Sequence, residues 1–210
     1  SYDGVSLPYN VGVRYKGSSG SAENTVQKKS FNISVDFVNA DQDLNGYYTI
    51  VLNGAYLDNT FMHEVVYRHC INRYIPASQV NYVNLHINGE DYGLYANTQH
   101  LNATFIKEWF LSGKGTRWRA EPDETGPGTT AGDYGTGYSG LNYLGEAPAA
   151  YEPYYDIKKS RKENPYEDLI AVTRVLENTV PDSMENEISK VLDLDRTLWF
   201  LACENIFTDE

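Results

Sequence analysis

Four cationic residues gather where two short predicted strands meet a Gly/Ser-rich stretch. Arg14 and Lys16 lie at the end of the first strand, and Lys28 and Lys29 open the second, with residues 17–27 between them. Cationic side chains beside a glycine-bearing loop, whose backbone N–H groups can turn inward, are able to hold phosphate. An ordinary solvated hairpin has the same composition, so this stretch alone leaves both interpretations open.

Glu64 adds a second element to this set. It lies in the middle of a helix predicted over residues 60–74, directly after the third predicted strand. A lysine on an early strand, paired with a glutamate on the following helix, is the arrangement that protein kinases use to position ATP phosphates. The competing interpretation is that the lysines are solvated and Glu64 is a surface residue, as charged side chains usually are.

Other patterns that could carry chemistry lack the context they need. The stretch "GTGYSG" over residues 135–140 matches a dinucleotide-binding pattern by letter, but no strand precedes it and no helix follows. In "HEVVYRH" the position four residues after His63 is Tyr67, so the two histidines cannot share a zinc-binding face. No G-x-S-x-G elbow marks a serine nucleophile. We therefore return to the cationic set and the elements that position it.

The first half of the chain is rich in strand patterns. Apolar and polar residues alternate over 11–16 and 31–37, a third strand is predicted over 46–54, and a short one over 116–120. The clearest hairpin spans residues 80–99, where Asn88-Gly89 is the pair that a type I′ turn prefers. A short helix is predicted over residues 102–111.

The second half is predicted to be helical after a long loop. Residues 121–153 are rich in Gly, Pro, Thr and Tyr, which predicts a loop longer than compact domains usually contain. Asn164 and Glu167 match a capping box for a helix over 165–178, and helices over 182–192 and 193–207 follow.

This order predicts an α+β fold. We expect a single domain over residues 1–210, incomplete at its C-terminus. Its expected parts are a β-rich part (1–120), a Gly/Tyr-rich loop (121–153) and a helical part (154–210).

The bulk composition excludes some classes of partner. The formal net charge of −12 and the pI near 4.7 argue against nucleic acid, which needs a cationic surface, and against anionic membranes. No apolar run approaches the roughly 20 residues of a membrane helix, and no signal peptide is visible. Cys70 and Cys203 both fall in apolar helical segments, which favours buried free thiols, although one disulfide stays possible in an exported protein.

Four blocks of the sequence resemble the spore coat protein H (CotH) kinase family. They are "VGVRYKGSS", "KKSFNISVDF", "HINGEDYGLYANTQHLNATFIKEWF" and "DLDRTLWFLACENIF", in the family's order from Val11 to the end of the chain. The resemblance implies an atypical, secreted or surface-associated kinase with a fold distantly related to protein kinases. It also implies ATP and Mg²⁺ or Mn²⁺ as cofactors and a protein substrate of the cell surface or spore coat. The lack of a long apolar run predicts no membrane insertion.

The same resemblance suggests roles for individual residues. It makes Lys29 the expected phosphate-binding lysine, with Lys28 as the neighbouring alternative, and Glu64 the glutamate that holds it. The further nucleotide-binding candidates are Arg14, Lys16, Ser18 and Ser19, and the catalytic candidate is Asp209. No residue is assigned to the metal. Gln99 departs from the acidic residue that many relatives carry at that position.

Two other functions remain as alternatives. A carbohydrate-binding or adhesion module would suit the acidity and the 18 tyrosines, with exposed rings of residues 134–155 stacking on sugars. A pseudokinase scaffold would bind nucleotide or a protein without turnover.

Overall fold

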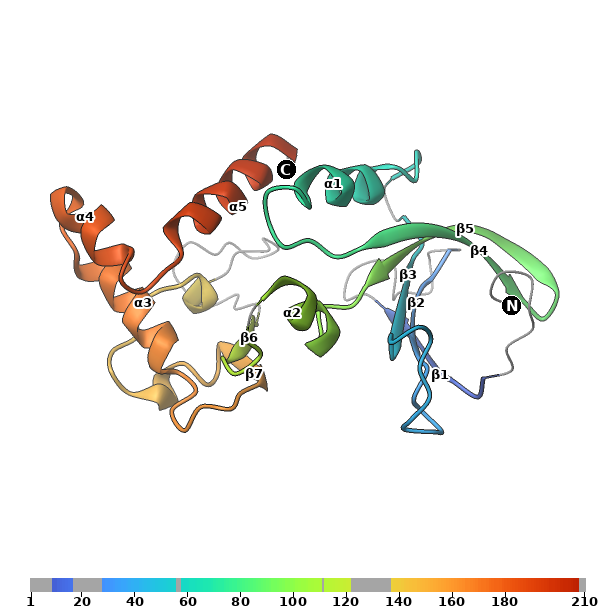
Figure 1. Ribbon diagram of the computed structural model, residues 1–210, viewed down its shortest axis with the longest axis horizontal. Helices are drawn as coiled ribbons and strands as arrows, with labels where there is room; N and C mark the ends of the chain where they lie inside the picture. The colour runs from blue at the N-terminus through green and yellow to red at the C-terminus, as the bar shows by residue number, and fades with distance from the viewer. Residues whose placement is uncertain (1–8, 17–27, 56–57, 111, 122–136, 208–210) are drawn as a thin grey trace. The chain divides into compact units, whose positions relative to one another are not determined.

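The computed structural model describes residues 9–16, 28–55, 58–110, 112–121 and 137–207 (Figure 1). The chain divides into two compact units. The first comprises Ser1–Leu111 with Cys203–Glu210, and the second comprises Ser112–Ala202. The described elements are helices and a mainly antiparallel sheet, which confirms the predicted α+β class.

The first unit contains a five-stranded antiparallel sheet in the order β1-β2-β3-β5-β4. Its strands are β1 (Gly12–Lys16), β2 (Ser30–Ser34), β3 (Thr49–Asn53), β4 (Val80–Ile87) and β5 (Glu90–Gln99). Phe31 of β2 lies opposite Leu52 of β3, and Leu52 lies opposite Asn97 of β5. Because side chains alternate along a strand, these three residues share one face of the sheet.

Strand β2 is shorter than the alternation predicts. The pattern extends to Phe37, but the strand ends at Ser34 and the chain turns at Val35. The Gln42 side-chain amide donates to the Val35 carbonyl at 2.6 Å, and this bond takes the acceptor that another strand residue would use. The Phe37 ring instead packs over the backbone of Gly12 and stays 72% exposed.

The β4–β5 hairpin confirms the predicted turn. Asn88 and Gly89 have φ angles of 54° and 86°, so both central residues are left-handed, as a type I′ turn requires. Ile87 lies opposite Glu90 across this turn. The turn therefore sets the register of the two longest strands in the sheet.

Two helices of the first unit begin at polar side chains. Helix α1 (His63–Ile71) follows Asp58, whose carboxylate accepts from the His63 amide at 2.9 Å. Helix α2 (Ala103–Trp109) begins at Asn102, whose side chain accepts from the Thr104 and Phe105 amides. Each side chain satisfies backbone donors that the first turn leaves unpaired.

The end of helix α5 (Leu194–Phe207) completes a hydrophobic cluster with α1 and the segment after it. Ile71, Ile75, Ala77 and Cys203 are its buried members. Cys70 and Cys203 are both free thiols, and burial raises the pKa of the Cys203 thiol. The prediction of free thiols is therefore confirmed for both cysteines, whereas the predicted burial holds for Cys203 and Cys70 is only partly buried.

The second unit pairs two short strands with helices. Strand β6 (Arg117–Ala120) pairs antiparallel with β7 (Tyr155–Lys159), and the 3₁₀ turns η1 (Gly137–Ser139) and η2 (Pro148–Ala150) lie between them in the chain. Helices α3 (Glu167–Asn178) and α4 (Pro181–Ile188) follow, and then the first part of α5. The sequence analysis missed β7, because its partner is more than 30 residues away and its own pattern is short.

Helix α3 begins later than the capping pattern predicts. Its first residue is Glu167, and the N-cap position belongs to Tyr166, with no side-chain cap. The Asn164 carbonyl accepts from the Glu167 amide at 3.3 Å, whereas the Asn164 side chain makes no cap bond. The capping-box prediction was therefore wrong, because the turn before the helix is closed by backbone rather than side-chain atoms.

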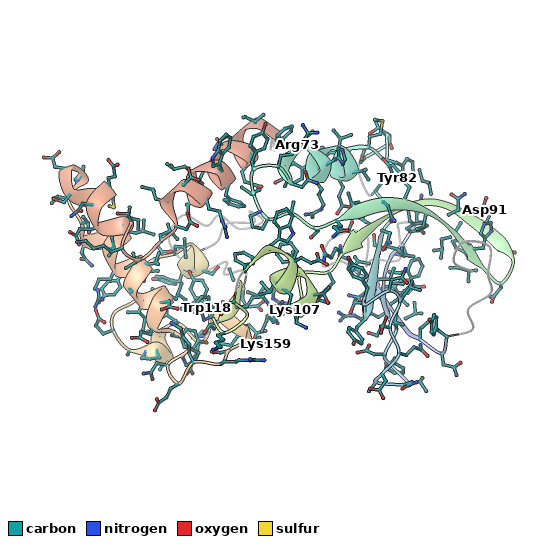
Figure 2. All side chains as sticks on the ribbon, in the orientation of Figure 1. Arg73, Tyr82, Asp91, Lys107, Trp118 and Lys159 are labelled. Atoms are coloured by element: carbon teal, nitrogen blue, oxygen red, sulfur yellow. The ribbon has the colours of Figure 1, made fainter. Side chains whose placement is uncertain are left out.

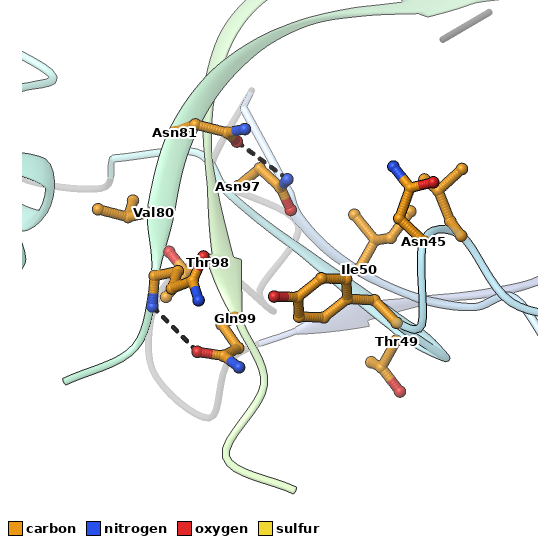
Figure 3. Close-up of a pocket in the computed structure, with 11 residues that line it drawn as sticks. Asn45, Thr49, Ile50, Val80, Asn81, Asn97, Thr98 and Gln99 are labelled. Atoms are coloured by element: carbon orange, nitrogen blue, oxygen red, sulfur yellow. Dashed lines mark hydrogen bonds between the residues drawn. The ribbon is translucent and has the colours of Figure 1, made fainter. Parts of the chain in front are cut away.

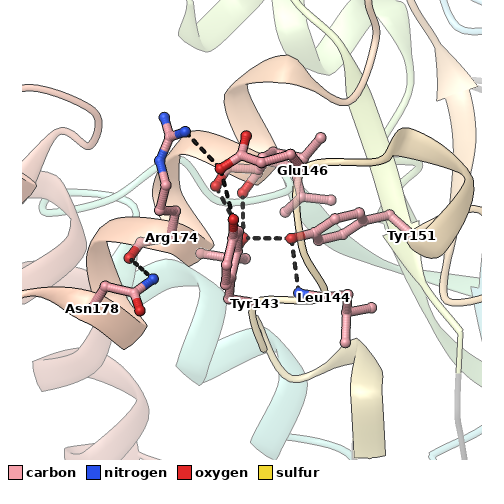
Figure 4. Close-up of polar contacts among 9 residues, drawn as sticks. Tyr143, Leu144, Glu146, Tyr151, Arg174 and Asn178 are labelled. Carbon is pink, nitrogen blue, oxygen red and sulfur yellow. Dashed lines mark hydrogen bonds and ion pairs between the residues drawn. The ribbon is translucent and has the colours of Figure 1, made fainter.

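Buried tyrosines form the core of the second unit (Figure 4). Tyr151 is fully buried, and its hydroxyl accepts from the Leu144 amide at 3.0 Å and bonds the Thr173 hydroxyl at 3.1 Å. The Tyr155 hydroxyl accepts from the Leu141 amide at 2.8 Å. Tyr151 and Tyr155 therefore serve packing and internal hydrogen bonds, and neither presents a ring for stacking on a sugar.

Candidate functional site

Lys28 is used within the fold. Its ammonium group donates to the Leu94 carbonyl and lies over two rings, 4.1 Å from the centroid of Phe61 and 4.6 Å from that of Tyr95. Both contacts are of the cation–π type. Burial lowers the pKa of Lys28. Its side chain links β5 to the segment before α1 and has little freedom to reach a ligand.

Lys29, in contrast to Lys28, has no described partner for its amine. Its amine nitrogen is buried and has no hydrogen-bond partner among the residues that the structure describes. A buried amine without a partner is costly, at about 1–3 kcal/mol for a neutral polar group and more for a charged one. Such groups are rare in folded proteins and call for an explanation, of which an absent anionic partner is one.

The backbone at Lys29 packs tightly against the end of β3. A Cβ atom on Gly54 would lie 3.1 Å from the Lys28 carbonyl oxygen and 3.5 Å from that of Lys29. The Gly54 amide donates to the Ser30 hydroxyl at 3.0 Å, and this hydroxyl donates to Asn53 Oδ1 at 3.3 Å. The start of β2 is thus fixed against β3 at the point where Lys29 lies.

Glu64 joins α1 to the same part of the sheet. Its carboxylate accepts from Asn53 Nδ2 at 2.7 Å and from the Thr98 hydroxyl at 2.9 Å, and it pairs with Arg68 at 3.3 Å. Within the described ranges the ion pair of Glu64 is with Arg68, and none joins it to Lys28 or Lys29. Glu64 is connected to the Lys29 position through Asn53 and Ser30 rather than by direct contact.

The segment between β3 and α1 has an unusual backbone. Ala55 and Phe61 have φ angles of 57° and 60°, a left-handed conformation that costs free energy for residues with a Cβ. The Tyr82 hydroxyl donates to the Phe61 carbonyl at 2.7 Å, and Figure 2 labels Tyr82 on β4. This bond holds the Phe61 ring where it covers Lys28.

Strand β1 brings further candidates to this region. Lys16 lies opposite Ser30 and Arg14 opposite Asn32, so Lys16 is beside the start of β2 and Arg14 is two residues further along. Both side chains are exposed. Ser18, Ser19 and the catalytic candidate Asp209 lie outside the described residues.

Aromatic rings line one face of the sheet next to these cations. The ring centroids of Tyr15 and Phe31 are 5.6 Å apart, and those of Phe31 and Tyr95 are 6.1 Å apart. Tyr95 is fully buried, whereas Tyr15 is 64% exposed at the edge strand. The row therefore ends in an accessible ring, on the face of β1 opposite to the Arg14 and Lys16 side chains.

Gln99 has a defined partner in this chain. Its side-chain nitrogen donates to Glu108 Oε2 of α2 at 2.6 Å, and its oxygen accepts from the Gln79 amide at 3.1 Å. An acidic residue at position 99 would place two carboxylates within hydrogen-bond distance, and their repulsion would disfavour ionisation of both. A neutral glutamine at position 99 therefore suits the neighbouring Glu108 carboxylate better than an acidic residue would.

This arrangement can bind an anion. It combines a buried lysine amine without a described partner and exposed cations on the neighbouring strand. The sequence matches the family described as "CotH kinase protein" over residues 13–209. The chain belongs to the CotH kinase protein family. A search of curated protein sequences gives no match.

Membership of the CotH kinase family indicates a kinase-like transferase. Families of this kind use ATP and a divalent metal in general. Across the described ranges, no group of three or more His, Cys, Asp or Glu side chains could hold a metal ion, so these residues do not fit one. No helix among the same residues is long and apolar enough to cross a bilayer.

The residues that hold Lys29 and Glu64 in place were not predicted from the sequence. Ser30, Asn53 and Gly54 fix the start of β2, and Thr98 binds Glu64. The Asn53-Gly54 pair at the end of a predicted strand was a detectable signal, since glycine there marks a close backbone approach. Nothing local pointed to Thr98.

Proposed function

We propose that this CotH-family chain binds ATP and transfers its γ-phosphoryl group to a Ser or Thr hydroxyl of an extracellular or surface protein. The observation that carries the proposal is the buried Lys29 amine, which lacks a described partner. A phosphate oxygen would supply the charge and the acceptor that this amine needs. Family membership supports the reaction class.

The environments of the two neighbouring lysines support a choice between them. The Lys28 ammonium group is engaged by the Leu94 carbonyl and two rings, whereas Lys29 has no comparable contact. Glu64 fits the role of a positioning residue, because its bonds to Asn53 and Thr98 fix the end of β3 against which Lys29 packs. In this proposal Lys29 pairs with a phosphate oxygen, and Glu64 keeps the end of β3 in position.

The remaining candidates complete the proposed site. Lys16 and Arg14 would add positive charge beside the phosphates. Ser18 and Ser19 keep their proposed role in the loop that covers the phosphates.

ATP supplies the phosphoryl group when it is bound. In the transfer, a new bond forms between the substrate hydroxyl oxygen and the γ-phosphorus, and the bond from that phosphorus to the bridging oxygen breaks, which leaves ADP. The hydroxyl proton passes to Asp209, the base that the family resemblance suggests. Lys29 would neutralise charge on the phosphates and hold them in place.

The decisive comparison is between Lys29→Met and Lys28→Met in the whole chain. ATP at 100 times its Kd with Mg²⁺ should stabilise the wild type by about 2.7 kcal/mol, measured by thermal or urea unfolding. Lys29→Met should abolish this stabilisation while leaving the ligand-free protein equally or more stable. Lys28→Met should destabilise the ligand-free protein but retain the response to ATP.

Transfer is measured separately with γ-labelled ATP, using casein and the chain itself as acceptors. Asp209→Asn should retain ATP binding and lose transfer. Binding without transfer in the wild type would favour the pseudokinase scaffold. A folded wild type that shows no response to ATP would exclude the nucleotide site and leave the binding module as the better explanation.

A further inference from the structure

A pocket of about 230 Å³ lies on the first unit, and none of its lining residues is cationic (Figure 3). It is formed at the start of β3 and β4 and the end of β5, together with the turn before β3. Its lining residues are Leu44, Asn45, Tyr47, Thr49, Ile50, Gln79, Val80, Asn81, Asn97, Thr98 and Gln99. The volume is below the roughly 300–1,000 Å³ of pockets for drug-sized ligands, so it suits a single ring or sugar unit.

The chemistry of the lining is polar but uncharged. Eight of its eleven residues have amide, hydroxyl or phenol groups, and the other three are aliphatic. None carries an ionised side chain at neutral pH. Phosphate, carboxylate and metal ions would therefore find no partner of opposite charge, whereas a neutral ligand with several hydroxyl groups would find many donors and acceptors.

Three polar side chains of the pocket lining are held in place by hydrogen bonds to one carboxylate of helix α2. Glu108 of α2 accepts from Gln99 at 2.6 Å, from Gln79 Nε2 at 3.4 Å and from the Tyr47 hydroxyl at 3.2 Å. Burial and the Glu108 carboxylate raise the pKa of Tyr47, which keeps the phenol protonated. Side chains oriented in advance lose less entropy when a ligand binds.

Asn81 and Asn97, on the same face of the sheet as Gln99, form a second polar pair. Asn97 Nδ2 donates to Asn81 Oδ1 at 3.0 Å, and Figure 3 shows this bond between the neighbouring strands β4 and β5. The bond leaves Asn97 Oδ1 as an acceptor and Asn81 Nδ2 as a donor, without partners among the described residues. A hydroxyl group donates and accepts at once, so one sugar hydroxyl, or two adjacent ones, could satisfy both atoms.

We propose that this pocket binds a neutral sugar unit through Asn81 and Asn97. The proposal goes beyond the kinase function and does not depend on it, because Asn81 and Asn97, which would contact the sugar, take no part in the Lys29 site. Thr98 also lines the pocket, but its hydroxyl donates to Glu64. The two amides would read hydroxyl positions, and Ile50, which shares their face of the sheet, would contact the apolar face of the sugar ring. A purine base is the competing ligand, since amide side chains also pair with its edge.

The test is a titration of the whole chain with the methyl glycosides of glucose, galactose and N-acetylglucosamine, and with adenosine, followed by amide NMR. At least one glycoside should shift the amide signals of residues 79–81 and 97–99. Asn81→Ala should weaken that glycoside at least tenfold. Asn84→Ala is the matched control, because Asn84 is an exposed asparagine of the same strand outside the pocket, and binding should be unchanged.

The wild-type signals decide the question even if Asn81→Ala does not fold. Shifts of residues 79–81 and 97–99 with adenosine, but with none of the glycosides, would overturn the sugar assignment. The absence of shifts with every glycoside at millimolar concentrations would also overturn it. Loss of ATP binding in Lys29→Met with glycoside binding intact would separate this pocket from the nucleotide site.

Discussion

Glu64 and Asn53 are joined by a hydrogen bond of 2.7 Å that ties helix α1 to the end of strand β3. The same carboxylate accepts from the Thr98 hydroxyl of β5, so it connects one helix to two neighbouring strands. Glu64 therefore affects the site indirectly, by holding α1, β3 and β5 together, because its described partners do not include Lys28 or Lys29.

Replacement of Glu64 by Gln should therefore affect stability as well as function. The glutamine amide has one oxygen to accept from Asn53 and Thr98, and its NH₂ group would face another donor. We expect a loss of about 1–3 kcal/mol in the free energy of urea unfolding. Glu90→Gln changes an exposed glutamate of β5 and should stay within about 0.5 kcal/mol of the wild type. Equal effects of the two substitutions would contradict the bridging role of Glu64.

Tyr67 should make stability depend on alkaline pH. Burial and its hydrogen bond to Glu204 raise the pKa of Tyr67 from 10.0 to about 12. The unfolded chain therefore loses this proton first, so the contribution of Tyr67 is fully present below pH 10 and is lost between pH 10 and about 12. The fall in unfolding free energy across this range should be smaller in Tyr67→Phe.

The control for Tyr67 is Tyr48→Phe, which removes an exposed phenol. It should show the same alkaline fall as the wild type, measured by urea unfolding at intervals from pH 9 upward. If the alkaline fall in unfolding free energy is unchanged in Tyr67→Phe, the Tyr67 phenol titrates alike in the folded and unfolded states, which contradicts the prediction.

The buried pair Tyr151 and Thr173 should be strongly coupled. Thr173 is fully buried, and its hydroxyl also bonds the carbonyls of Leu169 and Ile170. Thr173→Val would leave the Tyr151 hydroxyl without this partner, at a cost of about 1–3 kcal/mol. In a double-mutant cycle with Tyr151→Phe, the two losses should sum to more than the loss in the double variant. Simple additivity would mean that the bond contributes nothing measurable.

Sequence predicted best what depends on near neighbours. The Asn88-Gly89 turn was predictable because two left-handed residues in succession demand those residue types. Strand β7 was not predictable, because its five residues form a strand only by pairing with β6. The early end of β2 likewise depends on Gln42, whose side chain takes the Val35 carbonyl.

In the candidate site, too, local features were predictable from the sequence and tertiary contacts were not. The sequence marked Lys28 and Lys29 together, since adjacent lysines before a strand differ in nothing that a local pattern records. Only tertiary contacts distinguish them, because the rings of Phe61 and Tyr95 come from distant parts of the chain. The excess of tyrosine suggested sugar stacking, but Tyr151 and Tyr155 are buried, because a phenol can fill a core and still satisfy nearby backbone amides.

The cluster that α5 completes has a consequence for biosynthesis. Tyr67 bonds Glu204, 137 residues later in the chain, and Cys203 packs with Ile71 and Ile75. During translation, the cluster of the first unit therefore cannot close until Cys203 and Glu204 have been synthesised. Contacts of such long sequence separation slow folding, so the apolar face of α1 stays open to chaperones, or to aggregation, until that point.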